Sequence, residues 1–178
     1  MSNEKKRETD IGEWYEVYGD AIFKYILMMV QDYQQAEDLT QETFIKAYRF
    51  YDTFNYHSTR KTWLFSVARN TTIDYLRKRK PFEFIKEFFL HNKRDVKPSP
   101  DEFLVLKENA QELYAILKKM KSSYKEVILL RKVKGFTIKE TSEVLHWSEG
   151  KVKTTLSRAL TDLKSRLAKE GYSHETKF

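Results

Sequence analysis

The sequence contains no cysteine, and this absence excludes several kinds of chemistry at once. Without a thiol the chain cannot form a disulfide, a thiolate metal site or a cysteine nucleophile. The absence also suits a reducing compartment, where disulfides do not persist. Proline and glycine are scarce too, with 3 and 5 residues among 178. Because these residues interrupt helices, and because Leu, Lys and Glu are abundant, the composition predicts an all-α protein.

Long apolar runs are also missing, and no stretch approaches the roughly 18 apolar residues that a membrane span requires. Residues 1–10 carry charges of both signs with no apolar run behind them. We therefore expect a frayed tail rather than a signal peptide, and a cytoplasmic protein. Lys and Arg outnumber Asp and Glu by 33 to 26, which leaves a formal net charge of +7. That excess favours an anionic partner, such as DNA, RNA or a membrane surface.

The three prolines, Pro81, Pro98 and Pro100, lie close together and mark a boundary between two helical segments. Because proline disrupts a helix, we expect Pro81 to end the helix before it. The segments on the two sides are expected to form two small helical domains with a flexible linker between them. The predicted organisation is a domain at residues 1–80, a linker at 81–102 and a domain at 103–178.

The first two predicted helices, residues 11–31 and 34–51, are both amphipathic. The second is the more informative, because its two faces differ in composition. At 100° per residue, Leu39, Phe44 and Ala47 fall on an apolar half, which we expect in the core. The pattern leaves two interpretations of the opposite half open, a solvated face and a docking surface for a basic partner protein. That opposite half carries an acidic and amide patch with one isoleucine, formed by Asp38, Gln41, Glu42 and Ile45, and Arg49 falls on the same side.

The third predicted helix, residues 59–80, ends in four consecutive cations, Arg77, Lys78, Arg79 and Lys80. Cations at a helix C-terminus complement the macrodipole. They can also neutralise nucleic-acid phosphates, while aromatic rings stack on unpaired bases and an amide reads a base edge. Both interpretations stay open from the pattern alone. The polar stripe beside the cations consists of Ser66, Asn70, Asp74 and Arg77, with Trp63 on the neighbouring aromatic stripe.

The predicted linker is rich in phenylalanine. Large aromatic side chains are not normally left in water, so we expect a short amphipathic helix that packs on one of the domains or on a partner. The residues are Phe82, Phe84, Phe88 and Phe89, with Ile85 and Leu90.

The C-terminal domain carries the pattern of a helix-turn-helix. Thr137 and Glu140 form a capping box before a helix at 138–145, and residues 146–148 break the chain. Ser148 can then cap a longer helix at 149–167. That helix has an apolar stripe opposite a polar arc, as a reader of the DNA major groove requires. The arc consists of Lys153, Thr154, Ser157, Arg158 and Thr161. An ordinary helical hairpin with a solvated face is the alternative.

Several of these segments together resemble the bacterial sigma-70 family of RNA polymerase sigma factors. AEDLTQETF at residues 36–44 is similar to the family's region 2, and TWLFSVARN at 62–70 with IDYLRK at 73–78 to its promoter-melting and −10 segment. GFTIKE at 135–140 with VKTTLSRA at 152–159 is similar to the region 4 helix-turn-helix. Two domains with a short linker resemble the extracytoplasmic-function (ECF, group 4) class.

The resemblance implies protein partners for the chain. It implies core RNA polymerase, with contacts to the clamp helices of the largest subunit and to the flap. It also implies an anti-sigma factor, which in this family is often membrane-anchored and would hold the chain at the inner face of the membrane. The family's linker is commonly polar or acidic, so this phenylalanine-rich linker departs from the family's pattern. Its exposed phenylalanines are a candidate surface for that factor. The residues that the resemblance assigns to core polymerase are Asp38, Gln41, Glu42 and Ile45.

The resemblance also implies two promoter contacts. Flipped bases of the −10 element would be captured by the N-terminal domain, and flipping costs a few kcal/mol that stacking and hydrogen bonds must offset. The −10 residues are Trp63, Ser66, Asn70, Arg77, Lys78, Arg79 and Lys80. The −35 element would be read in the major groove. The −35 residues are Ser148, Lys151, Lys153, Thr154, Ser157 and Arg158.

Two other classes of protein compete with this interpretation. A stand-alone helix-turn-helix regulator would need neither the acidic patch on the second helix nor the aromatic and amide face on the third. An enzyme is disfavoured, because the four histidines are scattered and no glycine-rich phosphate loop is present. We therefore expect no catalytic residue, no metal and no cofactor.

Overall fold

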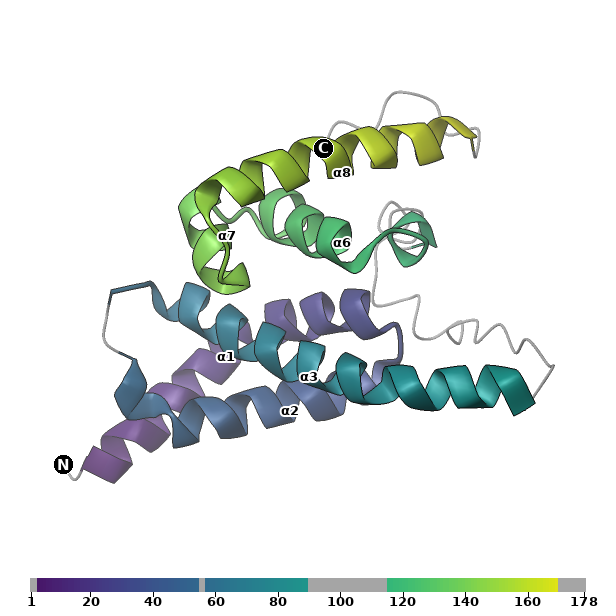
Figure 1. Ribbon diagram of the computed structural model, residues 1–178. Coiled ribbons are helices and arrows are strands. Elements are labelled where there is room, and N and C mark those ends of the chain that lie inside the picture. Colours follow the sequence, from purple (N-terminus) through teal and green to yellow (C-terminus); the bar gives the residue numbers. More distant parts are fainter. Residues whose placement is uncertain (1–2, 55–56, 90–114, 170–178) are drawn as a thin grey trace. The chain divides into compact units, whose positions relative to one another are not determined.

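The computed structural model describes residues 3–54, 57–89 and 115–169, and of residues 80–89 the backbone alone. Within these ranges every regular element is a helix, which confirms the all-α class (Figure 1). None of the described helices is long and apolar enough to cross a membrane. The elements are α1 (Asn3–Val30), α2 (Tyr33–Arg49), the 3-10 turn η1 (Tyr51–Thr53), α3 (Arg60–Phe89), α6 (Ser122–Ile128), the π-helical turn η2 (Leu129–Val133), α7 (Ile138–Leu145) and α8 (Glu149–Lys169).

Backbone contacts divide the chain into two compact units. The first combines Met1–Asn55 with Val67–Val105, and the second combines Tyr56–Ser66 with Leu106–Phe178. The first turns of α3 are therefore grouped with the helix-turn-helix, and the rest of α3 with α1 and α2. The domain boundaries expected from the prolines stay a prediction.

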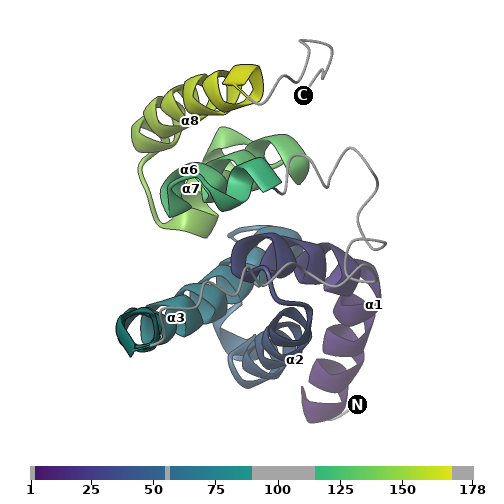
Figure 2. The ribbon, with the colours of Figure 1, turned by 90° about the vertical axis from the view of Figure 1, so that its right-hand side faces the viewer.

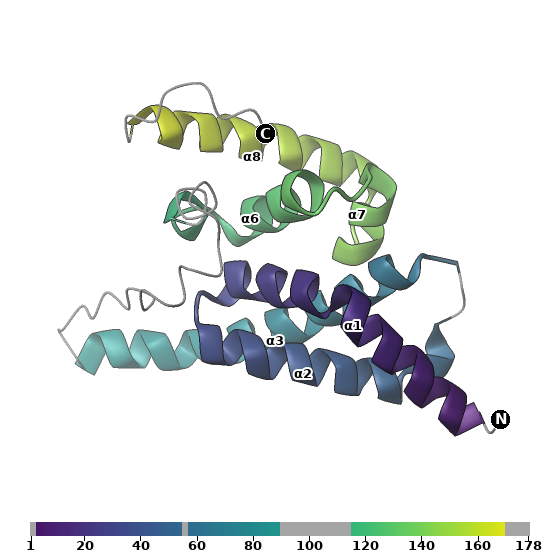
Figure 3. The same cartoon turned by 180° about the vertical axis from the view of Figure 1, so that it is seen from behind.

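A hairpin of α1 and α2 forms the core of the first unit (Figures 1 and 3). The chain reverses at Gln31, which has a left-handed φ of 62°. Asp32 then caps α2, because its side chain accepts a hydrogen bond from the backbone N–H of Gln35 at 3.0 Å. Ile22 and Tyr25 of α1 are fully buried, as the apolar stripe predicts. From residue 67 onward, α3 runs alongside this hairpin (Figures 1 to 3).

The first correction concerns the start of α1. We expected residues 1–10 to fray, but the helix begins at Asn3, eight residues before the apolar stripe begins at Ile11. The extra turns carry no apolar stripe of their own that the sequence could reveal. They are held instead by Arg7 and Asp10, whose partners Asp52 and Tyr51 lie more than 40 positions away in the sequence.

The second correction concerns Pro81, which does not end α3. The helix continues through Pro81 to Phe89 (Figure 1). An interior proline removes one backbone hydrogen bond and costs about 3 kcal/mol, but it does not stop its neighbours from adopting helical dihedrals. No second breaker follows before Pro98. The first part of the expected linker is therefore helical, while the side chains of its phenylalanines and the rest of the linker lie outside the described residues.

The second unit packs α6 and α7 against α8 (Figure 2). Val127 of α6, Val144 of α7 and Val152 of α8 are each 0% exposed and lie in its core. The α-helical turns of α6 widen into the π turn η2, in which the N–H of Lys134 donates to the carbonyl of Leu129 at 2.8 Å. The local sequence pattern gives no sign of the wider turn.

One lysine of this unit is buried. Lys125 of α6 is 9% exposed, and its neighbour Glu126 is 3% exposed. Burial lowers the pKa of the Lys125 ammonium, the Glu126 carboxylate opposes that shift, and the Lys118 ammonium adds to it. Lys125 therefore belongs to the interior of the unit and adds nothing to the charge available to a partner.

The connections around α7 follow the predicted capping chemistry. Gly135 adopts a left-handed φ of 72° before the helix. The Thr137 side chain accepts from the N–H of Glu140 at 3.1 Å, and the Glu140 carboxylate accepts from the N–H of Thr137 at 2.7 Å. After α7, Ser148 caps the start of α8, accepting from the N–H of Lys151 at 3.2 Å. The turn and both helix starts of the helix-turn-helix are thus as predicted.

Candidate nucleic-acid and protein interfaces

The predicted patch on α2 lies on the exposed side of that helix. Asp38, Gln41, Glu42 and Ile45 are all exposed, and Ile45 retains 52% of its accessible surface. The Glu42 carboxylate pairs with the Lys46 ammonium one turn later at 2.8 Å. An apolar side chain surrounded by acidic and amide groups has the composition of a protein interface with a polar rim. The structure therefore brings together all four residues that the sequence grouped.

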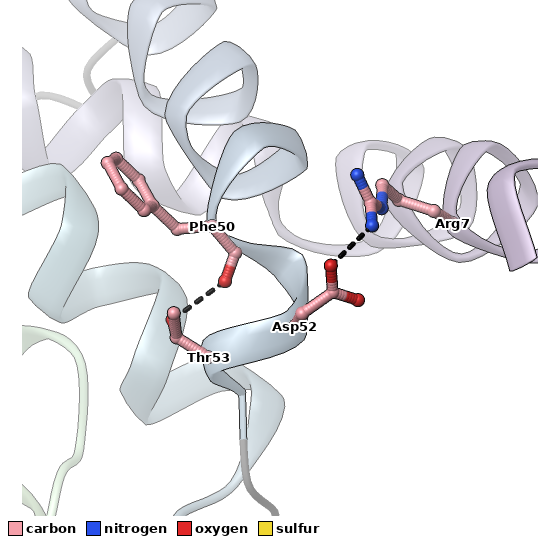
Figure 4. Close-up of polar contacts among 4 residues, drawn as sticks. All are labelled: Arg7, Phe50, Asp52 and Thr53. Atoms are coloured by element: carbon pink, nitrogen blue, oxygen red, sulfur yellow. Dashed lines mark hydrogen bonds and ion pairs between the residues drawn. The ribbon is translucent and has the colours of Figure 1, made fainter.

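Phe50, just beyond α2, is an exposed aromatic residue that the sequence analysis did not single out. It is 55% exposed, and its backbone carbonyl accepts from the Thr53 hydroxyl at 2.7 Å (Figure 4). That hydrogen bond closes the turn η1 against the end of α2. At 100° per residue Phe50 falls within 20° of Leu39, on the apolar half of the wheel, so the pattern placed it with the core residues and gave no signal of an exposed ring.

The polar stripe on α3 forms a continuous arc. At 100° per residue, Trp63, Ser66, Asn70, Asp74 and Arg77 fall within about 80° of one another. Trp63 and Ser66 are half-buried, whereas Asn70, Asp74 and Arg77 are exposed. The arc therefore combines an aromatic ring at one end with accessible amide and charged groups further along the helix. This is a suitable surface for stacking on a base and for hydrogen bonding to its edge.

The cation run lies next to this arc and inside the helix. Arg77 and Lys78 are exposed, and Arg79 is half-buried with one guanidinium N–H donating to the hydroxyl of Tyr75 at 3.3 Å. The side chain of Lys80 lies outside the described residues. Because the helix continues well beyond the run, the cations do not occupy its last turn, and the macrodipole does not explain them. The phosphate-binding interpretation, left open by the sequence, gains support from this position.

The first turns of α3 have contacts within the second unit. The ring of Phe65 meets the ring of Phe136 edge to face, with centroids 4.9 Å apart, and both residues are buried. The hydroxyl of Ser66 lies 3.4 Å from Nε2 of His146. Ser66, one of the predicted −10 residues, thus has a polar neighbour in the helix-turn-helix, while Asn70 is exposed to solvent.

The polar arc of α8 is exposed along its whole length, whereas the opposite apolar stripe is buried at Val152, Ala159 and Leu163 and half-buried at its other leucines. Val152 and Ala159 are fully buried, while no charged side chain in the first turns of α8 is. Gly150 leaves open space beside the first turn, since a side chain there would meet no atom within 4 Å. The predicted −35 residues Ser148, Lys151, Lys153, Thr154, Ser157 and Arg158 are all exposed.

The turn before α8 contains two residues that the sequence analysis did not assign. His146 ends α7 with a left-handed φ of 54°, a conformation in which glycine or asparagine is usual. Trp147 is half-buried, and the ammonium of Lys151 lies 4.2 Å from its ring centroid. The spacing of four between the tryptophan and the lysine was the available signal. The contact holds Lys151 at the base of the predicted DNA-binding face.

In the part of the chain that the structure describes, no three side chains of His, Asp or Glu gather as metal ligands would. The expectation that the protein binds no metal and no cofactor stays a prediction.

Comparison with known families and proteins agrees with the order of these surfaces. The family model of sigma-70 region 2 matches residues 14–82, which include the α2 patch and the α3 arc. The model of sigma-70 region 4 matches residues 110–163, which include the helix-turn-helix.

Curated relatives match most of the chain. The ECF RNA polymerase sigma factor SigX of Bacillus subtilis is 38% identical over 86% of this chain and 81% of its own length. The ECF RNA polymerase sigma factor SigM of the same organism is 35% identical over 87% of this chain and 93% of its own length.

Solved structures share the fold. The sigma factor RpoE of Bartonella quintana, solved with the anti-sigma factor NepR, gives a TM-score of 0.73 at 23% identity, covering 89% of this chain and 97% of that chain. CnrH, solved with the cytosolic domain of CnrY, gives a TM-score of 0.68 at 20% identity, covering 92% of this chain and 91% of that chain.

Proposed function

The chain belongs to the extracytoplasmic-function class of sigma-70 family RNA polymerase sigma factors, and we propose which of its surfaces bind the polymerase and the promoter. Sigma factors are not a class of enzyme, so the function of a promoter-directing factor of this family is to bind polymerase and DNA. The proposal rests on one observation above all: three exposed faces, on α2, α3 and α8, follow in the order that the two family regions require.

The face on α2 binds core polymerase. Asp38, Gln41, Glu42 and Ile45 contact the clamp helices of the largest subunit, with Ile45 at the centre and the acidic and amide groups around it. This arrangement is supported by the exposure of all four side chains, since an isoleucine 52% exposed on an otherwise polar helix face has no role in the core of this chain.

The arc on α3 binds the −10 element. Asn70 hydrogen-bonds a base edge, and the ring of Trp63 supports an unstacked base at the half-buried end of the arc. Arg77 and Lys78 hold the phosphates upstream, which adds an affinity that depends on salt but not on sequence. Stacking contributes about 1–3 kcal/mol per base, enough to offset the few kcal/mol that flipping costs when polymerase holds the strands.

The arc on α8 binds the −35 element in the major groove. Thr154 and Ser157 lie at positions that face base edges, while Lys153 and Arg158 reach bases or phosphates. Ser148 and Lys151 lie at the N-terminal end of α8, where the backbone N–H groups and the helix dipole attract a phosphate. The open space beside Gly150 supports a close approach of the duplex at this end.

We further propose that an anti-sigma factor regulates this chain in the cytoplasm and that membrane anchoring, where it occurs, comes through that partner. Of two proteins of the same fold, RpoE was solved with the anti-sigma factor NepR and CnrH with the cytosolic domain of CnrY. Among the described helices, none is apolar over a length that would span a membrane.

Run-off transcription with purified bacterial core polymerase on genomic promoter fragments tests the proposed function. We expect specific initiation that requires both the chain and the core enzyme. Absence of specific initiation at every promoter would refute the proposal. Footprints on the same fragments without polymerase would indicate a stand-alone helix-turn-helix regulator instead.

A further inference from the structure

The face on α2 is too small to form a stable protein interface alone. It consists of four exposed side chains, those of Asp38, Gln41, Glu42 and Ile45. A specific interface usually buries roughly 800 Å² of each partner and involves about 20–30 residues on each side. If this face binds core polymerase, as proposed above, we therefore expect the contact to continue onto the surface beside it.

Exposed apolar side chains indicate where the contact continues, because their removal from water favours binding. The described residues include five large ones, namely Tyr15, Val17, Ile45, Phe50 and Val133. Val133 belongs to the second unit, and Phe50 falls about 140° from Ile45 around α2. Val17 falls about 160° from Tyr15 around α1. These two residues of α1 therefore point to opposite sides of the helix, and only one side can border the α2 face.

Tyr15 is the residue of α1 that borders the α2 face. Its ring meets the ring of Phe44 edge to face, with centroids 4.9 Å apart. Phe44 is only 6% exposed, whereas Tyr15 keeps 52% of its accessible surface. At 100° per residue, Gln41 falls between Phe44 and Ile45 around α2. Because α1 and α2 lie side by side, the exposed part of the Tyr15 ring lies next to the Gln41 edge of the face (Figures 1 and 3).

Packing within the first unit restrains the Tyr15 ring before any partner binds. Phe44 contacts the ring from α2, and the backbone of Gly19 lies beside it one turn later in α1. A Cβ at residue 19 would lie 3.6 Å from Cε2 of Tyr15, at van der Waals contact. A ring restrained in advance loses little conformational freedom on binding. Restrained aromatic side chains at the edge of a polar face are suited to act as anchors of a protein interface.

We propose that Tyr15 is an aromatic anchor of the core-polymerase interface, which therefore spans α1 as well as α2. The partner surface on the largest subunit offers basic groups to the acidic side chains of α2 and apolar groups to Ile45 and Tyr15. The inference rests on the proposed function of the α2 face and goes beyond it, because no residue assigned to that face lies on α1. Glu16 and Asp20 fall 100° or more from Tyr15 around α1 and stay outside the interface.

Photo-crosslinking of the full-length chain to purified core polymerase tests the contact directly. The photoreactive residue p-benzoylphenylalanine is placed at position 15, 45 or 17 in separate variants, and the crosslinked subunit is identified by mass spectrometry. Position 45 reports on the α2 face itself. Position 17 is the matched control, since Val17 is an exposed apolar residue on the other side of the same helix. We expect crosslinks to the largest subunit from positions 15 and 45 and none from position 17.

Competition binding to core polymerase then measures what the ring contributes. We expect Tyr15→Ala to weaken binding about tenfold, as for an aromatic anchor at an interface. Tyr15→Phe should weaken it by no more than about threefold, because the ring remains. Val17→Ala should bind like the unsubstituted chain. Circular dichroism on heating shows that each variant is folded at the assay temperature, and the crosslinking result decides the contact even if Tyr15→Ala is not.

Several results would overturn the anchor. A crosslink from position 45 without one from position 15 limits the interface to α2 and leaves the proposed function intact. Crosslinks from both positions with full affinity of a folded Tyr15→Ala variant mean that the ring lies near polymerase without anchoring it. Equal crosslinking from position 17 means that the contact is not specific to the Tyr15 side of α1. Absence of a crosslink from position 45 refutes the α2 face of the proposed function instead, and the extension onto α1 with it.

Discussion

Reversing the charge of the α2 face should lower the affinity for core polymerase much more than it lowers the free energy of unfolding. The variant is Asp38→Arg together with Glu42→Arg. Its cost to folding is small, since the Glu42–Lys46 pair is an exposed pair one turn apart, worth about 0.3–0.5 kcal/mol. The like charges that replace it destabilise by a similar amount. Asp38 adds only an exposed contact from the Gln34 amide at 3.4 Å.

The two costs differ in size. The folding cost sums to about 1 kcal/mol, against the roughly 5–15 kcal/mol by which domains are usually stable. The binding cost is larger, because like charges brought together at an interface cost several kcal/mol. Even about 3 kcal/mol corresponds to a loss of about 100-fold in affinity for core polymerase. The variant should therefore stay folded and fail to bind.

The chain offers a matched control on α1. Glu16 and Asp20 have the same spacing as Asp38 and Glu42, and Asp20 pairs with Lys24 one turn later at 2.8 Å. Glu16→Arg together with Asp20→Arg therefore repeats the change of charge and the loss of one exposed ion pair, at a surface to which we assign no partner.

Affinity is measured by competition of each variant against a fluorescently labelled chain for core polymerase, and folding by circular dichroism on heating. We expect similar melting temperatures for the two variants and a loss of affinity for the α2 variant alone. An α2 variant that binds core within threefold of the unsubstituted chain would show that this surface is not the polymerase contact. Equal losses in both variants would point to net charge rather than to the α2 face.

Three further predictions concern the DNA-binding faces and the helix-turn-helix. Asn70→Ala should lower open-complex yield by about tenfold at matched promoters, as expected for one lost base-edge contact, and an unchanged permanganate signal would contradict that role. Lys153→Ala with Arg158→Ala should reduce the slope of log affinity against log salt by about two in holoenzyme binding, and an unchanged slope would remove both residues from the phosphate contacts. Thr137→Ala should lower the unfolding free energy of the C-terminal unit by about 1 kcal/mol in urea titrations, and a change near zero would mean that the cap contributes little.

Local chemistry was enough to predict much of this molecule. The capping pair Thr137 and Glu140 located the start of α7. The spacing of apolar residues separated the buried face of α2 from its exposed face, because the direction of each side chain around a helix depends only on helix geometry. These predictions succeeded where a residue and its neighbours within one or two turns determine the structure.

Other features depend on contacts or exceptions that the local pattern does not contain. The start of α1 is held by Arg7 through Asp52 and Tyr51, far away in the sequence, so composition alone suggested a tail. Proline usually ends or kinks a helix, but α3 continues through Pro81, which only removes one backbone hydrogen bond. His146 adopts a conformation that the sequence rules assign to glycine or asparagine. The roles of the individual site residues stay predictions until they are tested by substitution.

The π turn η2 is a place where this chain could lose one residue by deletion without turning the helices that follow. Leu129–Val133 holds one residue more than an α-helical turn would need, as the hydrogen bond from the Lys134 N–H to the Leu129 carbonyl shows. A deletion elsewhere in a helix rotates everything after it by 100°, but a deletion within this turn can be absorbed as the π turn becomes an α turn. Relatives that differ by one residue are therefore expected to do so here, with α7 and α8 still able to face the same DNA groove.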